Sequence, residues 1–420
     1  INILTIKNDN QLTPLIVISS AIPKTNPELR AAKNAELEII HRSDLLALLI
    51  KSQSSIVVSG THGKTTTSTF IATFLGLSKQ DPTAIIGGLM PLYDSNAYSG
   101  KGKLLVAEAD ESDGTIIKFK SHIGLITNLE LDHTNYYANL ESLINTMQKF
   151  GKNCTQLVLN KDCKILKAHF KDAIWWSIQT FKNTDFAAIP IISNGQETIA
   201  NFYEKGELMG EIKIPLAGKH NLSNALAAIS ACRIAGISFL ELKNNLYKIK
   251  SPKRRFQLRG IWQKRQIIDD YAHHPTEIDA AISMARLMIN SEETSLPIIS
   301  KRLVVIFQPH RFSRTKAFQN EFAKNLIKAD AVILAPIYGA GEEVIEGINS
   351  ISIARLIKNK KINLPIFAAD DFTDLIKLVK EHTLENDLIL NMGAGDINLL
   401  WSELVKDESK KNYSELNIAA

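Results

Sequence analysis

The sequence has little of what marks secreted, membrane-spanning or nucleic-acid-binding proteins. Its three cysteines form no Cys-x-x-Cys pair and cannot all be bridged within the chain, which favours a reducing compartment, the cytoplasm, over secretion. No apolar run reaches the ~20 residues that span a bilayer, so no membrane insertion is expected. The 49 basic and 44 acidic residues leave a net charge of only +5 without a dense basic block, so a nucleic acid is not the expected partner.

The remaining composition, 45% apolar and 22% charged residues, is that of a folded globular protein. A chain of 420 residues exceeds one ordinary core, which predicts two or three domains. Apolar, β-rich runs alternate with helix-like stretches, a pattern typical of parallel α/β architecture. We expect a buried strand at 14–21, further strands at 103–110 and 122–129, and an antiparallel region at 189–216.

The stretch IVVSGTHGKTTTSTF, residues 56–70, is similar to a phosphate-binding loop but is too short. The common pattern has a glycine five positions before the glycine of Gly-Lys-Thr, where this sequence has Val58. Gly60 and Gly63 still permit a tight turn, and Lys64 begins a predicted helix. A strand–turn–helix joint with a surface lysine would have the same letters, so this stretch by itself leaves both interpretations open.

Oxygen ligands for a phosphate-bound Mg²⁺ are available nearby, beginning with the hydroxyl of Thr65. The segment VAEADESDGT, residues 106–115, ends a predicted strand with four carboxylates: Glu108, Asp110, Glu111 and Asp113. The segment TNLELDHTNYY, residues 127–137, follows the next strand and includes His133, which suits a metal ligand, a phosphate donor or a surface histidine. Because the carboxyl ends of parallel strands meet at one edge of a sheet, these clusters favour a single nucleotide and metal crevice.

A second group of polar residues follows a strand predicted in the last third of the chain. The segment DDYAHHPTE, residues 269–277, presents Asp270, Tyr271, His273 and His274. The adjacent side chains of the histidine doublet are expected to diverge, and no His-Glu-x-x-His or Cys-x-x-Cys context supports structural zinc. By itself, the doublet is therefore more typical of a loop than of a metal pair.

The segment FQPHRFSRT, residues 307–315, adds His310, Arg311 and Arg314. Arginines three positions apart share one helical face, which suits a bidentate grip on a carboxylate or a phosphate. A solvated basic face is the alternative, and the position at a strand end favours binding.

The motifs GTHGKTTT, EADESDGT, TNLELDH and GKHNLSNALAA occur in the order seen in the Mur ligases of peptidoglycan synthesis, which the chain resembles. That family characteristically uses a shortened phosphate loop, which would explain why Val58 stands where the common pattern has a glycine. The segments RRFQ (254–257), DDYAHHPTE and FQPHRFSRT favour the member that joins L-alanine to UDP-N-acetylmuramate.

The resemblance implies a three-domain α/β architecture. A partial Rossmann-like, UDP-binding domain would occupy residues 1–43, a central P-loop ATPase-like domain 44–252, and a C-terminal Rossmann-like domain 253–404, followed by a polar tail at 405–420. The glycine-rich turn by which these ligases hold the uridine diphosphate is missing before Ser55, so we expect the sequence to begin inside the first domain.

The resemblance further implies an ATP-dependent ligase of the cytoplasm that serves cell-wall synthesis, and through it cell shape and division. ATP would phosphorylate the lactyl carboxylate of UDP-N-acetylmuramate, and the amine of L-alanine would attack the acyl phosphate to give an amide, ADP and phosphate. Mg²⁺ would accompany ATP. We expect a monomer or a weak homodimer.

The resemblance also assigns roles to individual residues. Catalytic roles fall to Lys64, Glu108, His133, His273, Arg311 and Arg314. ATP would be held by Gly60, Thr61, His62, Gly63, Lys64, Thr65, Thr66, His220, Asn221, Asn224, Arg255 and Asp270. Substrate contacts would come from Asn128, Tyr271, His273, His310, Arg311 and Arg314. The metal ligands would be Thr65, Glu108 and His133, with Glu111 as the substitute.

Three other interpretations are compatible with parts of the pattern. A recycling ligase that adds a tripeptide to UDP-N-acetylmuramate shares the central motifs, but we expect neither RRFQ nor FQPHRFSRT in it. Folylpolyglutamate synthetases share the short loop without the C-terminal set. A truncated remnant could bind ATP without forming product.

Overall fold

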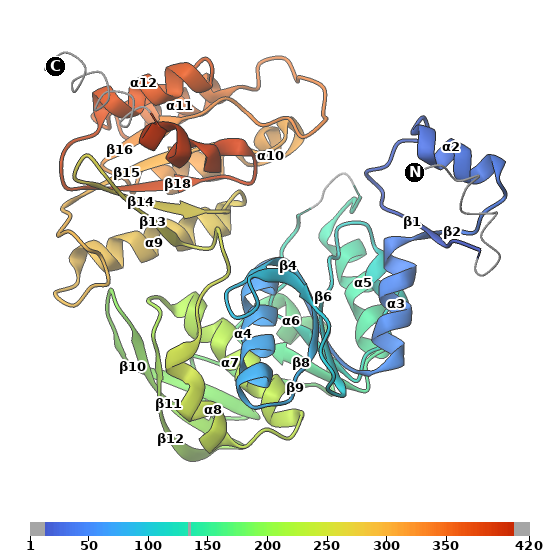
Figure 1. Ribbon diagram of the computed structural model, residues 1–420. Coiled ribbons are helices and arrows are strands. Elements are labelled where there is room, and N and C mark those ends of the chain that lie inside the picture. Colours follow the sequence, from blue (N-terminus) through green and yellow to red (C-terminus); the bar gives the residue numbers. More distant parts are fainter. Residues whose placement is uncertain (1–12, 133–135, 407–420) are drawn as a thin grey trace, which may run out of the picture.

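The computed structural model describes residues 13–132 and 136–406. Within them the chain forms a two-stranded, a ten-stranded and a six-stranded sheet, in that order along the sequence (Figure 1). The two larger sheets are packed with helices on both faces, as in an α/β protein, and the α/β prediction is confirmed. None of the helices in this part of the chain combines the length and apolarity needed to cross a membrane.

The first sheet pairs β1 (Ile16–Ile18) in parallel with β2 (Ile39–His41), connected through α2 (Pro27–Asn34). It lies at the edge of the molecule, apart from the C-terminal sheet (Figure 1). The prediction of a buried strand at 14–21 is wrong in both length and burial, since Val17 is 41% exposed. Two strands of three residues each are too small a sheet to bury their own side chains, whatever the hydrophobicity of those residues.

The central sheet has the order β12-β11-β10-β9-β8-β7-β3-β6-β4-β5. Its strands are β3 (Ser54–Ser59), β4 (Thr83–Met90), β5 (Ser95–Tyr98), β6 (Leu104–Glu108), β7 (Ile123–Ile126), β8 (Gln156–Asn160), β9 (Ile174–Ser177), β10 (Phe186–Ser193), β11 (Thr198–Glu204) and β12 (Glu207–Ile214). The predicted antiparallel region is confirmed, because β10, β11 and β12 pair as a meander whose last turn has positive φ at Lys205 and Gly206.

Helices cover both faces of this sheet. They are α3 (Arg42–Ser52), α4 (Lys64–Leu77), η1 (Thr115–Lys118), α5 (Leu140–Lys152), α6 (Lys164–His169), α7 (Lys219–Ile234), α8 (Phe239–Asn245) and η2 (Leu246–Lys248). Alternate residues of β3 point to opposite sides: Ile56 and Val58 join the core under α4 and α7, and Val57 joins the core under α3 and α5. This double burial explains why the middle of the strand, Ile56 to Val58, is continuously apolar instead of alternating.

The C-terminal sheet has the order β13-β14-β18-β15-β16-β17. Its strands are β13 (Gln257–Trp262), β14 (Arg265–Asp270), β15 (Arg302–Phe307), β16 (Ala331–Leu334), β17 (Ile366–Ala368) and β18 (Asp387–Met392), and its helices are α9 (Pro275–Asn290), α10 (Phe312–Leu326), α11 (Ser350–Lys360), α12 (Phe372–His382) and η3 (Asp396–Leu399). From β14 to β17 the pairing is parallel, so the segments after β14 and β15 leave from the same edge.

The two large sheets are joined through a short linker with an unusual backbone. Arg254 and Phe256 both have positive φ, 61° and 48°, which is uncommon for non-glycine residues. The guanidinium of Arg254 donates to the carbonyl oxygens of Gly393 and Gly395 at 3.0 and 3.1 Å. These bonds fasten the linker to the C-terminal sheet and hold the backbone in this conformation.

Candidate active site

The loop between β3 and α4 has the conformation that binding a phosphate requires. Gly60 and Gly63 have φ values of 122° and 81°, and a side chain at either position would collide with a neighbour. The amide N–H of His62 donates to Oδ1 of Asn128 at 2.9 Å, and Nδ2 of Asn128 donates to the carbonyl oxygen of His62 at 3.0 Å. Asn128 thus braces the loop with both of its polar groups, and its role as a substrate contact stays a prediction.

Lys64 lies in the mouth of this loop. Its ammonium group donates to the carbonyl oxygens of Gly60 and Thr61 at 2.7 and 3.2 Å and pairs with the buried carboxylate of Glu111 at 3.1 Å. Burial lowers the pKa of Lys64, but the charges of Glu111, Asp110 and Glu108 outweigh it and raise the pKa. The lysine is therefore a permanent cation at the helix N-terminus, where an anionic phosphate is favoured.

The oxygen atoms predicted for Mg²⁺ lie together. The hydroxyl of Thr65 donates to Oε1 of Glu108 at 2.8 Å, and Oε2 of the same carboxylate accepts the N–H of Gly87 at 2.7 Å. A hydroxyl beside a fixed carboxylate next to a phosphate loop is the donor set that Mg²⁺ accepts. His133, the third predicted ligand, lies outside the described residues.

The start of α7 packs against the loop. Oδ1 of Asn224 accepts a hydrogen bond from the Thr67 hydroxyl at 3.3 Å, and a side chain at position 63 would lie 2.5 Å from it. Asn221 donates to the carbonyl oxygen of Ala217, while His220 is exposed at the helix start. Thr66 is buried in the first turn of α4.

A cavity of about 100 Å³ opens beside Asn221, between the two large sheets. Apolar side chains dominate its wall, with a few amides and hydroxyls: Gln196, Pro215, Leu216, Ala217, Asn221, Ser251, Phe256, Leu258, Ile268, Met284, Met288, Ser295 and Leu296. A mostly apolar wall with a few polar groups is the usual lining of a small-molecule site.

Tyr271 lies between the two arginines of the linker. The guanidinium carbons of Arg254 and Arg255 lie 4.9 and 5.1 Å from the centre of its ring, within the range of cation–π attraction. Asp270, directly before it, accepts the backbone N–H of Phe256 at 2.8 Å and that of Ala272 at 2.7 Å. Burial raises the pKa of Asp270 to about 6, against the opposing effects of Arg255 and these two hydrogen bonds.

His273 and His310 face one another across the ends of β14 and β15, with ring centres 5.7 Å apart. Burial lowers the pKa of His273 to about 4, with the carboxylate of Glu277 opposing it, and burial together with His273 lowers the pKa of His310 to about 4. Nδ1 of His273 lies 3.0 Å from the carbonyl oxygen of Tyr271, so the neutral ring carries its proton there and Nε2 keeps a lone pair.

The expectation that Arg311 and Arg314 share a helical face is wrong. Arg311 is the N-cap of α10 with φ of 70°, outside the helix, and its side chain pairs with Glu342 at 3.2 Å. Arg314 lies inside the helix and pairs with Asp132 at 2.8 Å. Because Arg311 precedes the helix and has a positive φ, helical spacing does not set the relative direction of the two side chains.

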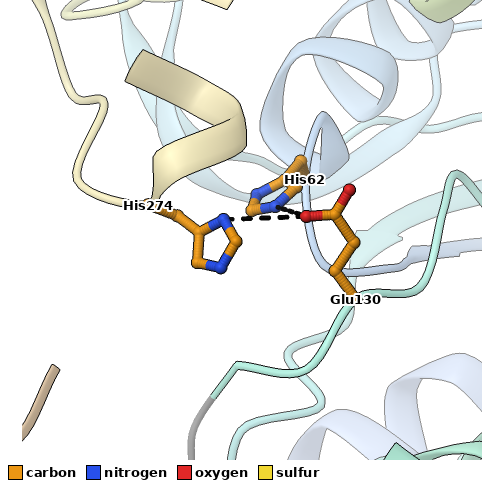
Figure 2. Close-up of side chains that lie close together, drawn as sticks. All are labelled: His62, Glu130 and His274. Carbon is orange, nitrogen blue, oxygen red and sulfur yellow. Dashed lines mark ion pairs between the residues drawn. The ribbon is translucent and has the colours of Figure 1, made fainter. Parts of the chain in front are cut away.

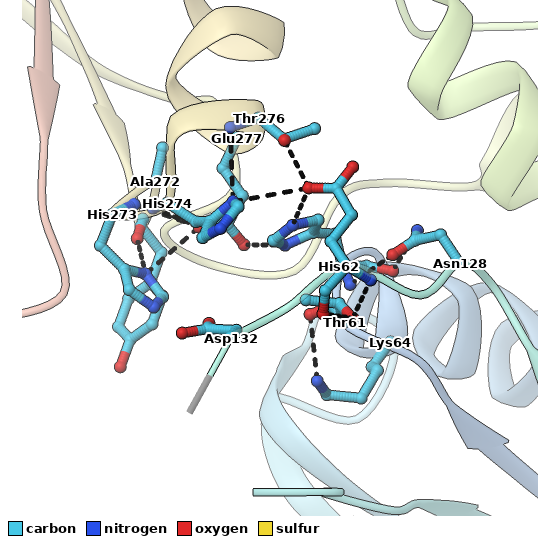
Figure 3. A network of polar contacts seen from close by, with 12 residues as sticks. Thr61, His62, Lys64, Asn128, Asp132, Ala272, His273, His274, Thr276 and Glu277 are labelled. Carbon is cyan, nitrogen blue, oxygen red and sulfur yellow. Dashed lines mark hydrogen bonds and ion pairs between the residues drawn. The ribbon is translucent and has the colours of Figure 1, made fainter. Parts of the chain in front are cut away.

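A polar network connects the phosphate loop to α9 (Figure 3). Nδ1 of His62 lies 3.2 Å from Oε1 of Glu277, and the hydroxyl of Thr276 donates to Oε2 of Glu130 at 2.5 Å. Burial lowers the pKa of His62, but hydrogen bonds to Glu130 and Glu277 outweigh it and raise the pKa to about 9. The loop of the central sheet and the first turn of α9 thus form one continuous site.

Comparison with known families accounts for nearly the whole chain. Residues 58–232 match the Mur ligase middle domain, residues 254–395 the Mur ligase glutamate ligase domain, and residues 1–54 the Mur ligase family catalytic domain. The chain belongs to the Mur ligase family. The resemblance found in the sequence motifs and the three-domain Mur ligase fold are both confirmed.

Three UDP-N-acetylmuramate–alanine ligases are similar to the chain over most of their length. A UDP-N-acetylmuramate–L-alanine ligase of Prochlorococcus marinus (strain MIT 9303) is 55% identical over 410 residues, 98% of this chain and 84% of the relative. One of Synechococcus sp. (strain CC9311) is 53% identical over 394 residues, 94% and 82% of the two chains. The solved UDP-N-acetylmuramate–alanine ligase of Thermotoga maritima superposes with a TM-score of 0.79 at 25% identity, over 96% of this chain and 87% of that one.

Sequence analysis of this Mur ligase missed three residues of the site: Glu130, Asp132 and Glu277. The signal for Glu277 was present, because a polar residue followed three positions later by glutamate marks a capping box, and His274 caps α9 in this way. Glu130 and Asp132 belong to the segment TNLELDHTNYY, but their partners Thr276 and Arg314 are 146 and 182 positions away in the C-terminal domain.

Proposed function

We propose that this chain is an ATP-dependent ligase that joins L-alanine to the lactyl carboxylate of UDP-N-acetylmuramate. The observation that carries the proposal is the 55% identity, over 98% of the chain, to a ligase of that name. As a Mur ligase the chain uses ATP. We place the reaction in the cytoplasm, where ATP is available, and the protein as a monomer or weak homodimer with the central and C-terminal domains at 44–252 and 253–404.

ATP binds with its phosphates on the loop from Gly60 to Thr66. The N-terminus of α4 and Lys64 supply positive charge, and the cavity beside Asn221 accepts the adenine. Arg255 closes over the phosphates from the linker side. The proposal is supported by the position of these groups on both sides of one domain interface.

Thr65 and Glu108 would hold Mg²⁺, which neutralises charge on the transferring phosphoryl group. His133 remains the proposed ligand on the side of the carboxylate substrate. Cationic side chains such as Lys64 also neutralise this charge. Positioning and charge neutralisation provide most of the catalysis in phosphoryl transfer.

Bond formation follows in two steps. The lactyl carboxylate oxygen attacks the γ-phosphorus, and ADP leaves; the L-alanine amine then attacks the acyl carbon, a C–N bond forms, and phosphate leaves. His273 is neutral at pH 7, and its Nε2 lone pair accepts a hydrogen bond from the attacking amine, whose proton leaves with the phosphate. Arg314 and His310 hold the carboxylate of the amino acid, with Arg311 and Tyr271 at the rim.

The recycling ligase is the closest rival, and a solved murein peptide ligase of Psychrobacter arcticus shares the fold with a TM-score of 0.65. At 19% identity that likeness concerns the fold alone. Nothing in it favours the tripeptide over L-alanine.

Phosphate release measured with ATP, Mg²⁺ and UDP-N-acetylmuramate tests the proposal directly. We expect release that depends on added L-alanine, with the amide product detected by mass spectrometry. Release that requires the tripeptide and ignores L-alanine would establish the recycling reaction. Nucleotide binding without any release would show an inactive chain.

A further inference from the structure

A second cation site is suggested by three side chains at the junction of the phosphate loop, β7 and α9. His62, Glu130 and His274 each offer one ligand atom, and these three atoms lie within 4.8 Å of one another (Figure 2). Nε2 of His62 lies 3.4 Å and Nδ1 of His274 lies 3.7 Å from the same oxygen, Oε2 of Glu130. The rings of the two histidines lie beside one another, with centres 4.7 Å apart, and both face that carboxylate (Figure 2).

These separations fit ligands around an ion better than they fit hydrogen bonds. Nitrogen–oxygen hydrogen bonds cluster at about 2.7–3.2 Å. Four ligands at ~2.0–2.1 Å from a tetrahedral Zn²⁺ lie about 3.3–3.4 Å from each other, since tetrahedral edges are ~1.6 times the bond length. The distances of 3.4 and 3.7 Å are close to that value, and they are also in the range of ion pairs between a protonated histidine and a carboxylate.

The surroundings of the cluster are those of a supported metal site. Nδ1 of His62 lies 3.2 Å from the carboxylate of Glu277, which would keep the hydrogen on this nitrogen while a bound ion displaced the proton from Nε2. Glu130 is fixed by the hydroxyl of Thr276. His274 faces the cluster through Nδ1, which also accepts the backbone N–H of Thr276 at 3.4 Å as the cap of α9.

We propose that His62, Glu130 and His274 bind a divalent transition-metal ion of the Zn²⁺ class, which ties the phosphate loop to α9. Two imidazoles and one carboxylate favour Zn²⁺, Co²⁺ or Mn²⁺ over Mg²⁺. The site is separate from the Thr65 and Glu108 pair and shares no ligand with it. Three protein ligands leave one coordination position for water or a substrate oxygen.

The ion would connect the central and C-terminal domains, because its ligands come from both sides of their interface. His62 and Glu130 belong to the central sheet's loops, and His274 caps the first helix of the C-terminal sheet. Sequence spacing gave no support for zinc, and the structure explains why: the ligands lie on three separate segments of the chain.

Cobalt binding tests the site without requiring ligase activity. The full chain, freed of metals and held in excess Mg²⁺, is titrated with Co²⁺ while visible absorption is recorded. We expect one equivalent of Co²⁺ with the bands of a four- or five-coordinate nitrogen–oxygen site. His62→Ala and His274→Ala should each weaken binding at least ~10-fold, whereas His169→Ala, at an exposed histidine, should not.

A variant that gains a new absorption band separates the loss of a metal ligand from misfolding. His274→Cys should keep Co²⁺ bound and add the near-ultraviolet charge-transfer band of a thiolate ligand. Unchanged spectra in both alanine variants would overturn the proposal, and so would loss of the signal in Glu108→Gln with its retention in His274→Ala. No Co²⁺ binding by the folded chain would also overturn it and leave the cluster as a proton-mediated contact.

Discussion

Arg314 and Asp132, 182 positions apart in the sequence, form an ion pair between the two large domains, with both side chains 8% exposed. Nη2 and Nε of Arg314 both donate to Oδ1 of Asp132, at 2.8 and 3.3 Å. The arginine that we propose as a carboxylate binder is thus already held by a carboxylate of the protein. A bound amino acid would compete with Asp132 for this guanidinium.

Asp132→Asn should loosen the contact between the domains. Removing one partner of a buried pair leaves the other charge uncompensated, at a cost of about 3–5 kcal/mol. We expect faster proteolytic cleavage in the linker at 251–256 in the absence of substrates. Asp44→Asn, which removes an exposed pair with Lys118, is the control and should leave the rate unchanged. Equal cleavage rates in all three proteins would contradict the role of the pair.

Lys64→Ala should abolish turnover and also lower the melting temperature, since it leaves the charge of Glu111 buried beside the loop. We expect a loss of phosphate release of ~10²-fold or more, the size seen when one charge-stabilising donor is removed. The double variant Lys64→Ala with Glu111→Gln separates the two effects. Its melting temperature should recover while its turnover does not. Recovery of turnover in the double variant would show that Lys64 is not needed for the reaction.

Thr65→Val should raise the Mg²⁺ concentration that half-saturates phosphate release, by ~10–100-fold if the hydroxyl ligates the ion. Thr65→Ser keeps the hydroxyl and is the matched control. Both side chains fit the buried first turn of α4, so a difference between them reports the hydroxyl. Identical Mg²⁺ dependence would exclude the hydroxyl as a ligand.

Much of the nucleotide site could be predicted because its parts are local. A β-branched run, two glycines and a lysine define the strand, the turn and the helix start within twelve residues, and the acidic cluster follows the neighbouring strand. Parallel pairing then brings the two ends together. These steps need only periodicity and the geometry of a sheet.

The C-terminal half of the site could not be predicted in the same way. The directions of Arg311 and Arg314 depend on a positive φ at Arg311, which no residue type at that position signals. The sequence predicted that the side chains of His273 and His274 diverge, but it did not predict their neighbours. In the structure His273 faces His310, and His274 lies beside His62. Which distant residue each one meets is decided by how the domains pack.

Asp270 offers a pH test of that packing. Its pKa is raised from 3.8 to about 6 by burial, so between those values the folded chain retains a proton that the unfolded chain has released. The free energy of unfolding must therefore fall by up to ~3 kcal/mol as the pH rises through this window, and it stays level above it.

The variant Asp270→Asn tests this expectation, because it cannot titrate and loses one acceptor for the N–H groups of Phe256 and Ala272. Its melting temperature relative to the parent chain should therefore rise from about pH 4 to about pH 6.5 and then level off. Asp94→Asn, at an exposed aspartate, provides the baseline. A constant offset between Asp270→Asn and the parent across that range would mean that the carboxyl of Asp270 is solvated, and that the linker does not close over the end of β14.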